Sequence, residues 1–182
     1  MEFRLYYRGP LKANGGPAHK QALRRAFHPQ LRELWNQLPL SAFRRLLRPG
    51  EGTCMLTRAH GFTFATVVHH SVALVAELQV LLLRPEAPGA IVTQGGDIDN
   101  RIKTLLDALK APIEPNAIPP GDEPQPGEEP FHVLLEDDAL VTRVDVATDR
   151  LLDPSAASGD VVAVIRVRTK QLAVYLATVG LA

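Results

Sequence analysis

Carboxylates gather in two short stretches of this sequence, and their spacing suits the binding of a divalent cation. In residues 95–100 (GGDIDN), Asp97 and Asp99 lie two residues apart where a helix is expected to begin. Side chains i and i+2 of an extended backbone point to the same side, so both carboxylates can coordinate one cation. Residues 136–138 (EDD) precede an expected strand. If that strand lies beside the helix start, the acids converge and repel one another unless a cation neutralises them.

A cluster of this kind suits Mg²⁺, which prefers oxygen ligands and can polarise a phosphoryl oxygen or activate water. Lys103 follows Asp99 by four residues, and Asp107 follows Lys103 by four, so all three lie on one face of the expected helix. The same ladder is typical of ordinary surface ion pairs, and an aspartate at a helix start is a common cap. From spacing alone, a metal site and a solvated acidic surface both remain open.

The order of these residues resembles the RusA family of Holliday junction resolvases. The family pattern is D-x-D-N-x-x-K-x-x-x-D-A-L at a helix start, followed by a D-D-x-x-V segment. This chain matches the first part from Asp97 to Leu109 and the second part from Asp137 to Val141. The resemblance is clear over roughly residues 90–148, and the combination of the two parts is specific where D-x-D-N alone is not.

The resemblance implies a small α+β homodimer that binds four-way DNA junctions and cuts two strands symmetrically with Mg²⁺ or Mn²⁺. Matched residue by residue, Asp97, Asp99 and Asp138 would bind the metal ion, and Asp137 would be a supporting metal-binding acid. Lys103 would be the catalytic lysine, which neutralises the scissile phosphate or orients the attacking water. The matching asparagine and the last aspartate of the helix motif are expected to be structural.

Two features depart from the family pattern. No basic residue occurs in residues 91–96, where family members often have a run of arginines. The interval before Asp137 is long because it contains an insertion, rich in proline and glutamate, at about 112–130. These departures motivate an alternative function, a RusA-like module that grips branched DNA without cutting it.

The insertion has five acidic residues and no Lys or Arg, so it is expected to repel DNA phosphate. With seven of the fifteen prolines, it predicts little secondary structure and either a mobile lid or a contact to a partner subunit. The length of 182 residues suits a single domain, residues 1–182, that carries this insertion.

The net charge of zero conceals a strong asymmetry. Residues 1–60 hold 11 Lys and Arg against 3 Asp and Glu, whereas residues 61–182 hold 9 against 17. Arginines of the basic part either face DNA or are solvated helix faces, and the sequence leaves both open. They are Arg24, Arg25, Arg32, Arg44, Arg45 and Arg48.

Other features bear on the compartment and on metal binding by histidine. The single cysteine, Cys54, excludes an intrachain disulfide, and the longest apolar stretch, residues 71–83, is too short to span a bilayer. A cytoplasmic location without a membrane partner is therefore expected. His69 and His70 are expected to face opposite sides of a strand, and hence to be poor joint ligands of a metal ion.

The elements that must position these residues predict an α+β fold, with a mixed sheet of four to five strands and helices packed on it. Leucines at three- and four-residue steps predict helices over 18–38, with a break at Pro29, and over 98–110. The segments 61–69 and 72–83 are expected to pair as antiparallel strands. Further strands are expected at 2–8, 140–147 and 161–168.

Overall fold

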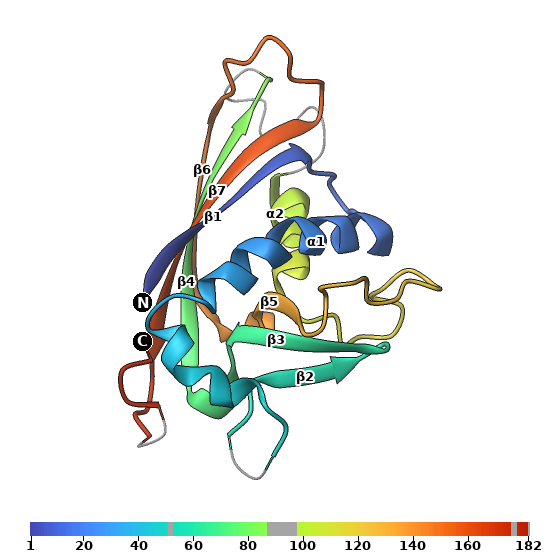
Figure 1. Cartoon of the computed structure of the whole chain (residues 1–182). Coiled ribbons are helices and arrows are strands. Elements are labelled where there is room, and N and C mark those ends of the chain that lie inside the picture. Colours follow the sequence, from blue (N-terminus) through green and yellow to red (C-terminus); the bar gives the residue numbers. More distant parts are fainter. Residues whose placement is uncertain (51–52, 87–97, 176–177, 182) are drawn as a thin grey trace.

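The computed structural model describes residues 1–50, 53–86, 98–175 and 178–181, and it has an α+β architecture (Figure 1). Its strands are β1 (Glu2–Pro10), β2 (Leu56–Ala59), β3 (Phe62–Val68), β4 (Leu74–Arg84), β5 (Phe131–Leu135), β6 (Val141–Arg150) and β7 (Asp160–Gln171). Its helices are α1 (Pro17–Leu34) and α2 (Ile98–Leu109), together with the 3₁₀ helices η1 (Leu40–Leu47), η2 (His70–Val72) and η3 (Asp138–Leu140). The described strands form a four-stranded sheet in the order β1-β7-β4-β6 and a three-stranded sheet in the order β2-β3-β5. The expected α+β class is confirmed, with two mixed sheets where the sequence predicted one.

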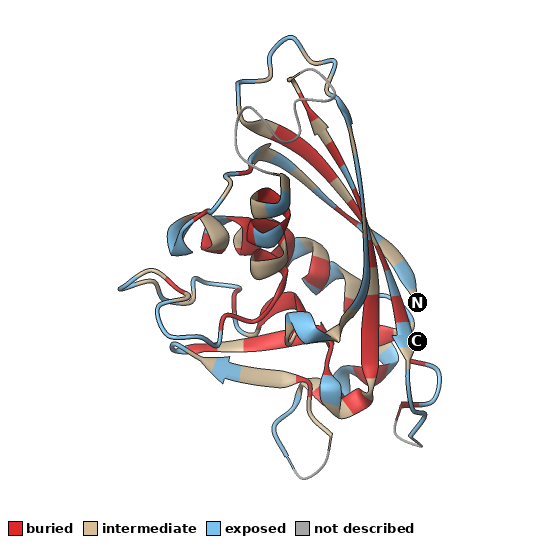
Figure 2. Ribbon diagram, turned by 180° about the vertical axis from the view of Figure 1, so that it is seen from behind, coloured by how far each residue is buried: buried red, intermediate tan, exposed pale blue. Residues whose placement is uncertain are grey.

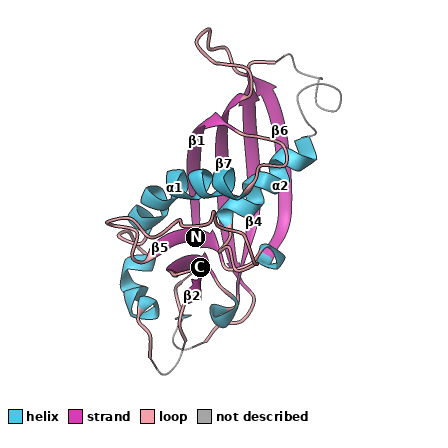
Figure 3. Ribbon diagram, turned by 90° about the vertical axis from the view of Figure 1, so that its right-hand side faces the viewer, coloured by secondary structure: helices cyan, strands magenta, loops and turns pink. Residues whose placement is uncertain are grey.

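The four-stranded sheet has one buried face and one exposed face. In β4, Leu78, Val80 and Leu82 are at most 2% exposed, whereas Leu81 between them is 39% exposed. This alternation follows from the two-residue period of a strand, and Figure 2 shows it as buried stripes across the sheet. Both α-helices lie on the buried face (Figure 3), so that face supplies most of the main core.

Helix α1 packs through the apolar stripe that the sequence predicts. Leu23, Phe27 and Leu31 are each at most 1% exposed. The expected break at Pro29 is wrong, because α1 continues through this proline to Leu34. Proline removes one backbone donor from a helix, but the buried stripe continues on both sides of it, and tertiary packing supplies most of a helix's stability.

The segments before and after His70 are strands, but the expected antiparallel pairing between them is wrong. β3 pairs with β2 and, in parallel, with β5, whereas β4 pairs with β6 and β7 in the other sheet. Between β3 and β4, η2 and Ala73, whose φ is 51°, redirect the chain from one sheet to the other. An apolar run identifies a strand, but it does not identify the partner of that strand.

The insertion at 112–130 contains neither a helix nor a strand, as expected, yet it is fastened to the rest of the chain. Its Ile118 is 7% exposed and packs in a second, small core with Phe62, Phe64 and Phe131. The centroids of these three aromatic rings lie 5.5 to 5.7 Å apart. The insertion is therefore part of the packed structure.

Ion pairs attach the same insertion to α1. The Arg25 guanidinium donates hydrogen bonds to Glu128 and to Asp122, both at 2.9 Å, and Glu128 is 8% exposed. Arg32 and His28 contact the Gly127 carbonyl oxygen, each at 3.2 Å. The structure thus places these acids against basic residues of the same chain, in contrast to the expected free lid; a contact with a partner subunit stays a prediction.

Replacing Arg25 tests this attachment. We expect Arg25→Ala to lower the free energy of unfolding by about 1–3 kcal/mol, because it leaves the largely buried Glu128 carboxylate without its guanidinium partner. Urea unfolding measures the change, and cleavage by a protease specific for glutamate should become faster after Glu128, since Glu123 and Glu129 are each followed by a proline, which blocks cleavage. Arg58→Ala removes an exposed arginine of β2 and is the matched control. Equal protease resistance in the two variants would contradict the attachment.

Two neutral histidines join α1 to β5. The His28 ring accepts a hydrogen bond at Nδ1 from the backbone N–H of His132, at 2.8 Å, and its Nε2 contacts the Gly127 carbonyl oxygen. Protonation of Nδ1 would remove the first of these bonds. Burial lowers the pKa of His28, and burial together with the charge of His28 lowers the pKa of His132 to about 4.

Stability should therefore depend on pH. Because both pKa values are lower in the folded chain, the unfolded chain binds more protons below about pH 6.5, and stability falls as the pH drops from there toward about 4. Both chains should lose stability between pH 7 and pH 5. We expect the loss in His132→Leu to be smaller than the loss in the parent chain by about 2 kcal/mol. His60→Asn, which removes an exposed histidine, should keep the parent's pH dependence in urea unfolding.

Candidate active site

A hollow of about 380 Å³ lies between α2, η3 and β6, and both acidic parts of the sequence contribute to it. Asp99, Lys103 and Asp107 line it from α2, and Asp138 lines it from η3. Three of the predicted site residues, Asp99, Lys103 and Asp138, therefore line the same hollow although they come from separate segments of the chain. We call it the acidic hollow.

The floor of the acidic hollow is apolar. Ile98, Ile102 and Leu106 of α2 face Val146 and Thr148 of β6 across it. β6 pairs only with β4 among the described strands, so it is an edge strand, and Val146 is 41% exposed. A charged rim over an apolar floor suits a ligand that has both charged and apolar parts.

The local sequence explains how α2 presents its charges. Leu105 and Leu109 are at most 1% exposed and face the core. Residues at three- and four-residue steps share a face of a helix, so burying the leucines turns Asp99 and Lys103 outward, and both are exposed. Asp99 is also the acidic residue of the first helical turn, where the helix dipole favours a negative charge.

The other predicted acids have different positions. Asp97 lies outside the described residues. Asp137 does not line the acidic hollow. Its Oδ1 accepts a hydrogen bond at 2.7 Å from the backbone N–H of Ala139, and so caps η3. Asp107 accepts a hydrogen bond from Lys20 Nζ at 2.6 Å, which supports the structural role expected for it.

Lys110, which lies just outside the family motif, contacts the site directly. Its Nζ lies 3.4 Å from Asp138 Oδ2 and 2.6 Å from Glu114 Oε1, and the residue is 9% exposed. Burial by itself would lower the pKa of Lys110, but the hydrogen bond and charge of Glu114 and the charge of Asp138 outweigh burial and raise it. The signal in the sequence is its spacing, because Lys110 follows Lys103 by seven residues, two helical turns away.

The rim of the hollow carries carboxylates, the type of donor that a hard divalent cation prefers. The side chain of Asp138 is 48% exposed and Asp99 is exposed, so both carboxylates are accessible to a solvated ion. Among the described residues, however, the acids of the hollow do not form a group of three ligands within 4.8 Å of one another. Mg²⁺ usually takes one or two protein carboxylates and retains several waters. Asp99 and Asp138 thus fit this ion by donor type and accessibility.

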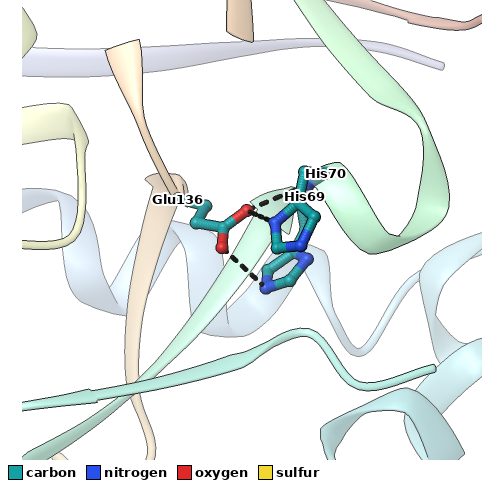
Figure 4. A group of neighbouring side chains, drawn as sticks. All are labelled: His69, His70 and Glu136. Carbon is teal, nitrogen blue, oxygen red and sulfur yellow. Dashed lines mark hydrogen bonds and ion pairs between the residues drawn. The ribbon is translucent and has the colours of Figure 1, made fainter. Parts of the chain in front are cut away.

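A second group with possible metal ligands lies at the ends of β3 and β5 (Figure 4). Ligand atoms of His69, His70 and Glu136 lie within 4.8 Å of one another, the one such group of three among the described residues. The expectation that the two histidines face opposite sides is wrong. β3 ends at Val68, and the turn into η2 stacks their rings with centroids 4.7 Å apart.

The geometry of this group suits hydrogen bonds better than a shared metal ion. The two ring planes are inclined by only 23°, whereas one ion would have to lie in both planes to meet both lone pairs. His69 Nδ1 accepts a hydrogen bond from the Ser71 N–H, although a metal-bound histidine normally donates from its second nitrogen. Burial lowers the pKa of His69, partly offset by the charge of Glu136. A neutral His69 therefore directs Nε2–H toward Glu136.

Glu136 holds together the two segments that connect the sheets, β3–η2–β4 and β5–η3–β6, which we call the two passages. Its carboxylate lies 3.4 Å from His69 Nε2 and 2.5 Å from His70 Nδ1, and it accepts the His70 backbone N–H at 3.0 Å. The Glu136 N–H donates to the Val68 carbonyl oxygen at 2.9 Å. These bonds fix the start of the segment that carries Asp138 into the acidic hollow.

Fewer arginines of the basic N-terminal part are available to bind DNA than the sequence suggested, because several are buried or paired within the chain. Arg24 is 2% exposed, and Arg25 is paired with Asp122 and Glu128, so neither is simply a solvated helix face. Arg44 donates to the Trp35 carbonyl oxygen and to Asn36. Most of these arginines thus hold this region of the fold together.

Comparison with known proteins adds no relative. No family model matches the chain, and no curated protein and no solved structure matches it significantly. The resemblance to the RusA family therefore depends on the residues of its two motifs. Among the helices of the described residues, none is long and apolar enough to cross a membrane.

Replacing Glu136 tests its role at the two passages. We expect Glu136→Ala to lower the free energy of unfolding by about 1–3 kcal/mol, because the buried ring of His69 and the backbone N–H of His70 lose their acceptor. Glu129→Ala removes an exposed glutamate and should change stability by less than about 0.5 kcal/mol in the same urea titration. Equal stability of the two variants would show that Glu136 does not join these passages.

Proposed function

We propose that this protein is a metal-dependent endonuclease of the RusA type, which cuts branched DNA such as four-way junctions by hydrolysing phosphodiester bonds. The observation that carries the proposal is the convergence of Asp99, Lys103 and Asp138 on one hollow. These residues occupy matching positions in both parts of the family pattern. Asp99 and Lys103 share one face of α2, and the tertiary structure adds Asp138 from a distant segment.

Each residue of the hollow has a role in this reaction. Asp99 and Asp138 would hold Mg²⁺ or Mn²⁺, with Asp97 as a further ligand by resemblance, and the ion would supply Lewis acidity and an activated water. Lys103 places a positive charge at the rim, where it can neutralise the scissile phosphate. Lys110 balances the charge of Asp138 and holds its carboxylate toward the hollow. The apolar floor would contact sugars and bases of the DNA.

A symmetric cut in two strands requires two sites. A homodimer with two-fold symmetry would present identical acidic hollows to opposed strands of a junction. This arrangement belongs to the proposal, together with the choice of branched DNA as the substrate.

Cleavage of a synthetic four-way junction tests the proposal. We expect cleavage by the parent chain with Mg²⁺, none in the presence of EDTA, and a loss of about a hundredfold or more in Asp99→Asn under single-turnover conditions. Asp149→Asn removes an exposed aspartate of β6 outside the hollow and should cut at the parent's rate.

Two results would contradict the proposal. Equal rates for Asp99→Asn and Asp149→Asn would remove Asp99 from the mechanism. Tight junction binding without metal-dependent cutting by the parent chain would favour the non-cleaving DNA-binding module.

A further inference from the structure

A second pocket, of about 280 Å³, adjoins the acidic hollow and is lined by cations. Lys20 and Arg24 line it from α1, Lys110 from the end of α2, and Glu114 and Asn116 from the insertion. Asp107 lines both this pocket and the acidic hollow. We call it the cationic pocket. Its three cations face two carboxylates, Asp107 and Glu114, so the lining has an excess of one formal positive charge.

Arg24 is the origin of this excess. It is 2% exposed, and its hydrogen bonds end on neutral oxygens, namely the backbone carbonyls of Asp107, Lys110 and Ala117 and the side-chain amide of Gln21. Burial lowers the pKa of Arg24 to about 10, against the opposing effect of nearby carboxylates, so the guanidinium is still charged at neutral pH. A buried cation without a carboxylate in hydrogen-bond contact is costly, and an anion in the pocket would offset that cost.

The two lysines can exchange their partners for such an anion. Lys20 Nζ lies 2.6 Å from Asp107 Oδ2, and their side chains are 27% and 20% exposed. Lys110 Nζ lies 2.6 Å from Glu114 Oε1, whose side chain is 51% exposed. The Lys20–Asp107 pair is partly exposed and such pairs contribute little to stability, and Glu114 can turn into solvent, so a phosphate that accepts from both lysines can displace the carboxylates.

From this geometry we infer that the cationic pocket binds a phosphate group, and that in the complex with DNA this is a backbone phosphate of the cut strand next to the scissile one. The inference rests on the proposed function for the identity of the strand. The pocket and the acidic hollow share Asp107, and Lys110 contacts both Glu114 and Asp138, so one strand can pass from one to the other. The pocket thereby supplies basic contacts that, in the family, the run of arginines before the first aspartate would supply and that this chain lacks.

Junction binding in EDTA tests the inference separately from cutting. Each phosphate contact contributes about 0.9 to the slope of log affinity against log salt, which amounts to about eightfold in affinity at 0.1 M salt. We expect Lys20→Gln to reduce the salt slope by about 0.9 and the junction affinity by about eightfold. Lys20→Arg should retain the slope and the affinity of the parent chain. Lys170→Gln is the matched control, because it also removes one lysine from a carboxylate pair, with Glu77 on the exposed face of the four-stranded sheet.

A further variant separates binding from a structural effect. Asp107→Asn removes the carboxylate that competes for Lys20, so it should bind the junction more tightly than the parent chain, by about the same factor. Loss of packing alone would weaken binding. Junction affinity unchanged in Lys20→Gln, or weakened in Asp107→Asn, would overturn the inference.

Inorganic phosphate distinguishes the source of the phosphate. If the pocket serves the DNA backbone, phosphate at millimolar concentration should compete with the junction for the parent chain and not for Lys20→Gln, compared with chloride at equal ionic strength. Binding of phosphate without any effect on the junction would overturn the assignment to DNA. Junction binding that depends on Lys20 in a parent chain that does not cut would refute the proposed nuclease and leave this inference standing.

Discussion

The placement of the candidate site depends on the bonds that Glu136 makes where the chain passes between its two sheets. The first passage runs from β3 through η2 to β4, and the second runs from β5 through η3 to β6. β3 and β5 are parallel neighbours in one sheet, and β4 and β6 are parallel neighbours in the other. The two passages therefore leave the same edge, and Glu136 ties the second to His69 and His70 of the first. Asp137 then caps η3, and Asp138 follows at the rim of the acidic hollow.

The charge asymmetry of the sequence is largely neutralised inside the fold. Basic residues of the N-terminal part meet acidic residues from later in the chain, as in the pairs of Arg25 with Glu128 and of Lys20 with Asp107. The same contacts attach the insertion and α2 to α1. Neutralisation is incomplete where Lys20, Arg24 and Lys110 meet, which is the pocket proposed to bind phosphate.

The acidic hollow and the cationic pocket together form a surface with opposite charges side by side. A site that hydrolyses a phosphodiester needs carboxylates for a cation and positive charge for the phosphates on either side. Lys110 links the two regions through Asp138 and Glu114. This arrangement supports a nuclease more strongly than the acidic residues do alone.

The sequence by itself determined the α+β class, the helix at 98–110 and several strands, because each follows from local periodicity. Its short motif also singled out Asp99, Lys103 and Asp138, which the structure places around one hollow. It did not determine that β3 and β4 belong to different sheets, that the helix continues through Pro29, or that His69 and His70 lie on one side. Those outcomes depend on the turn at Ala73 and on packing between distant segments. Only the tertiary structure brought Lys110 to Asp138 and buried Arg24, because the contacts of a charged side chain are set by the elements that fold around it, and no local pattern encodes them.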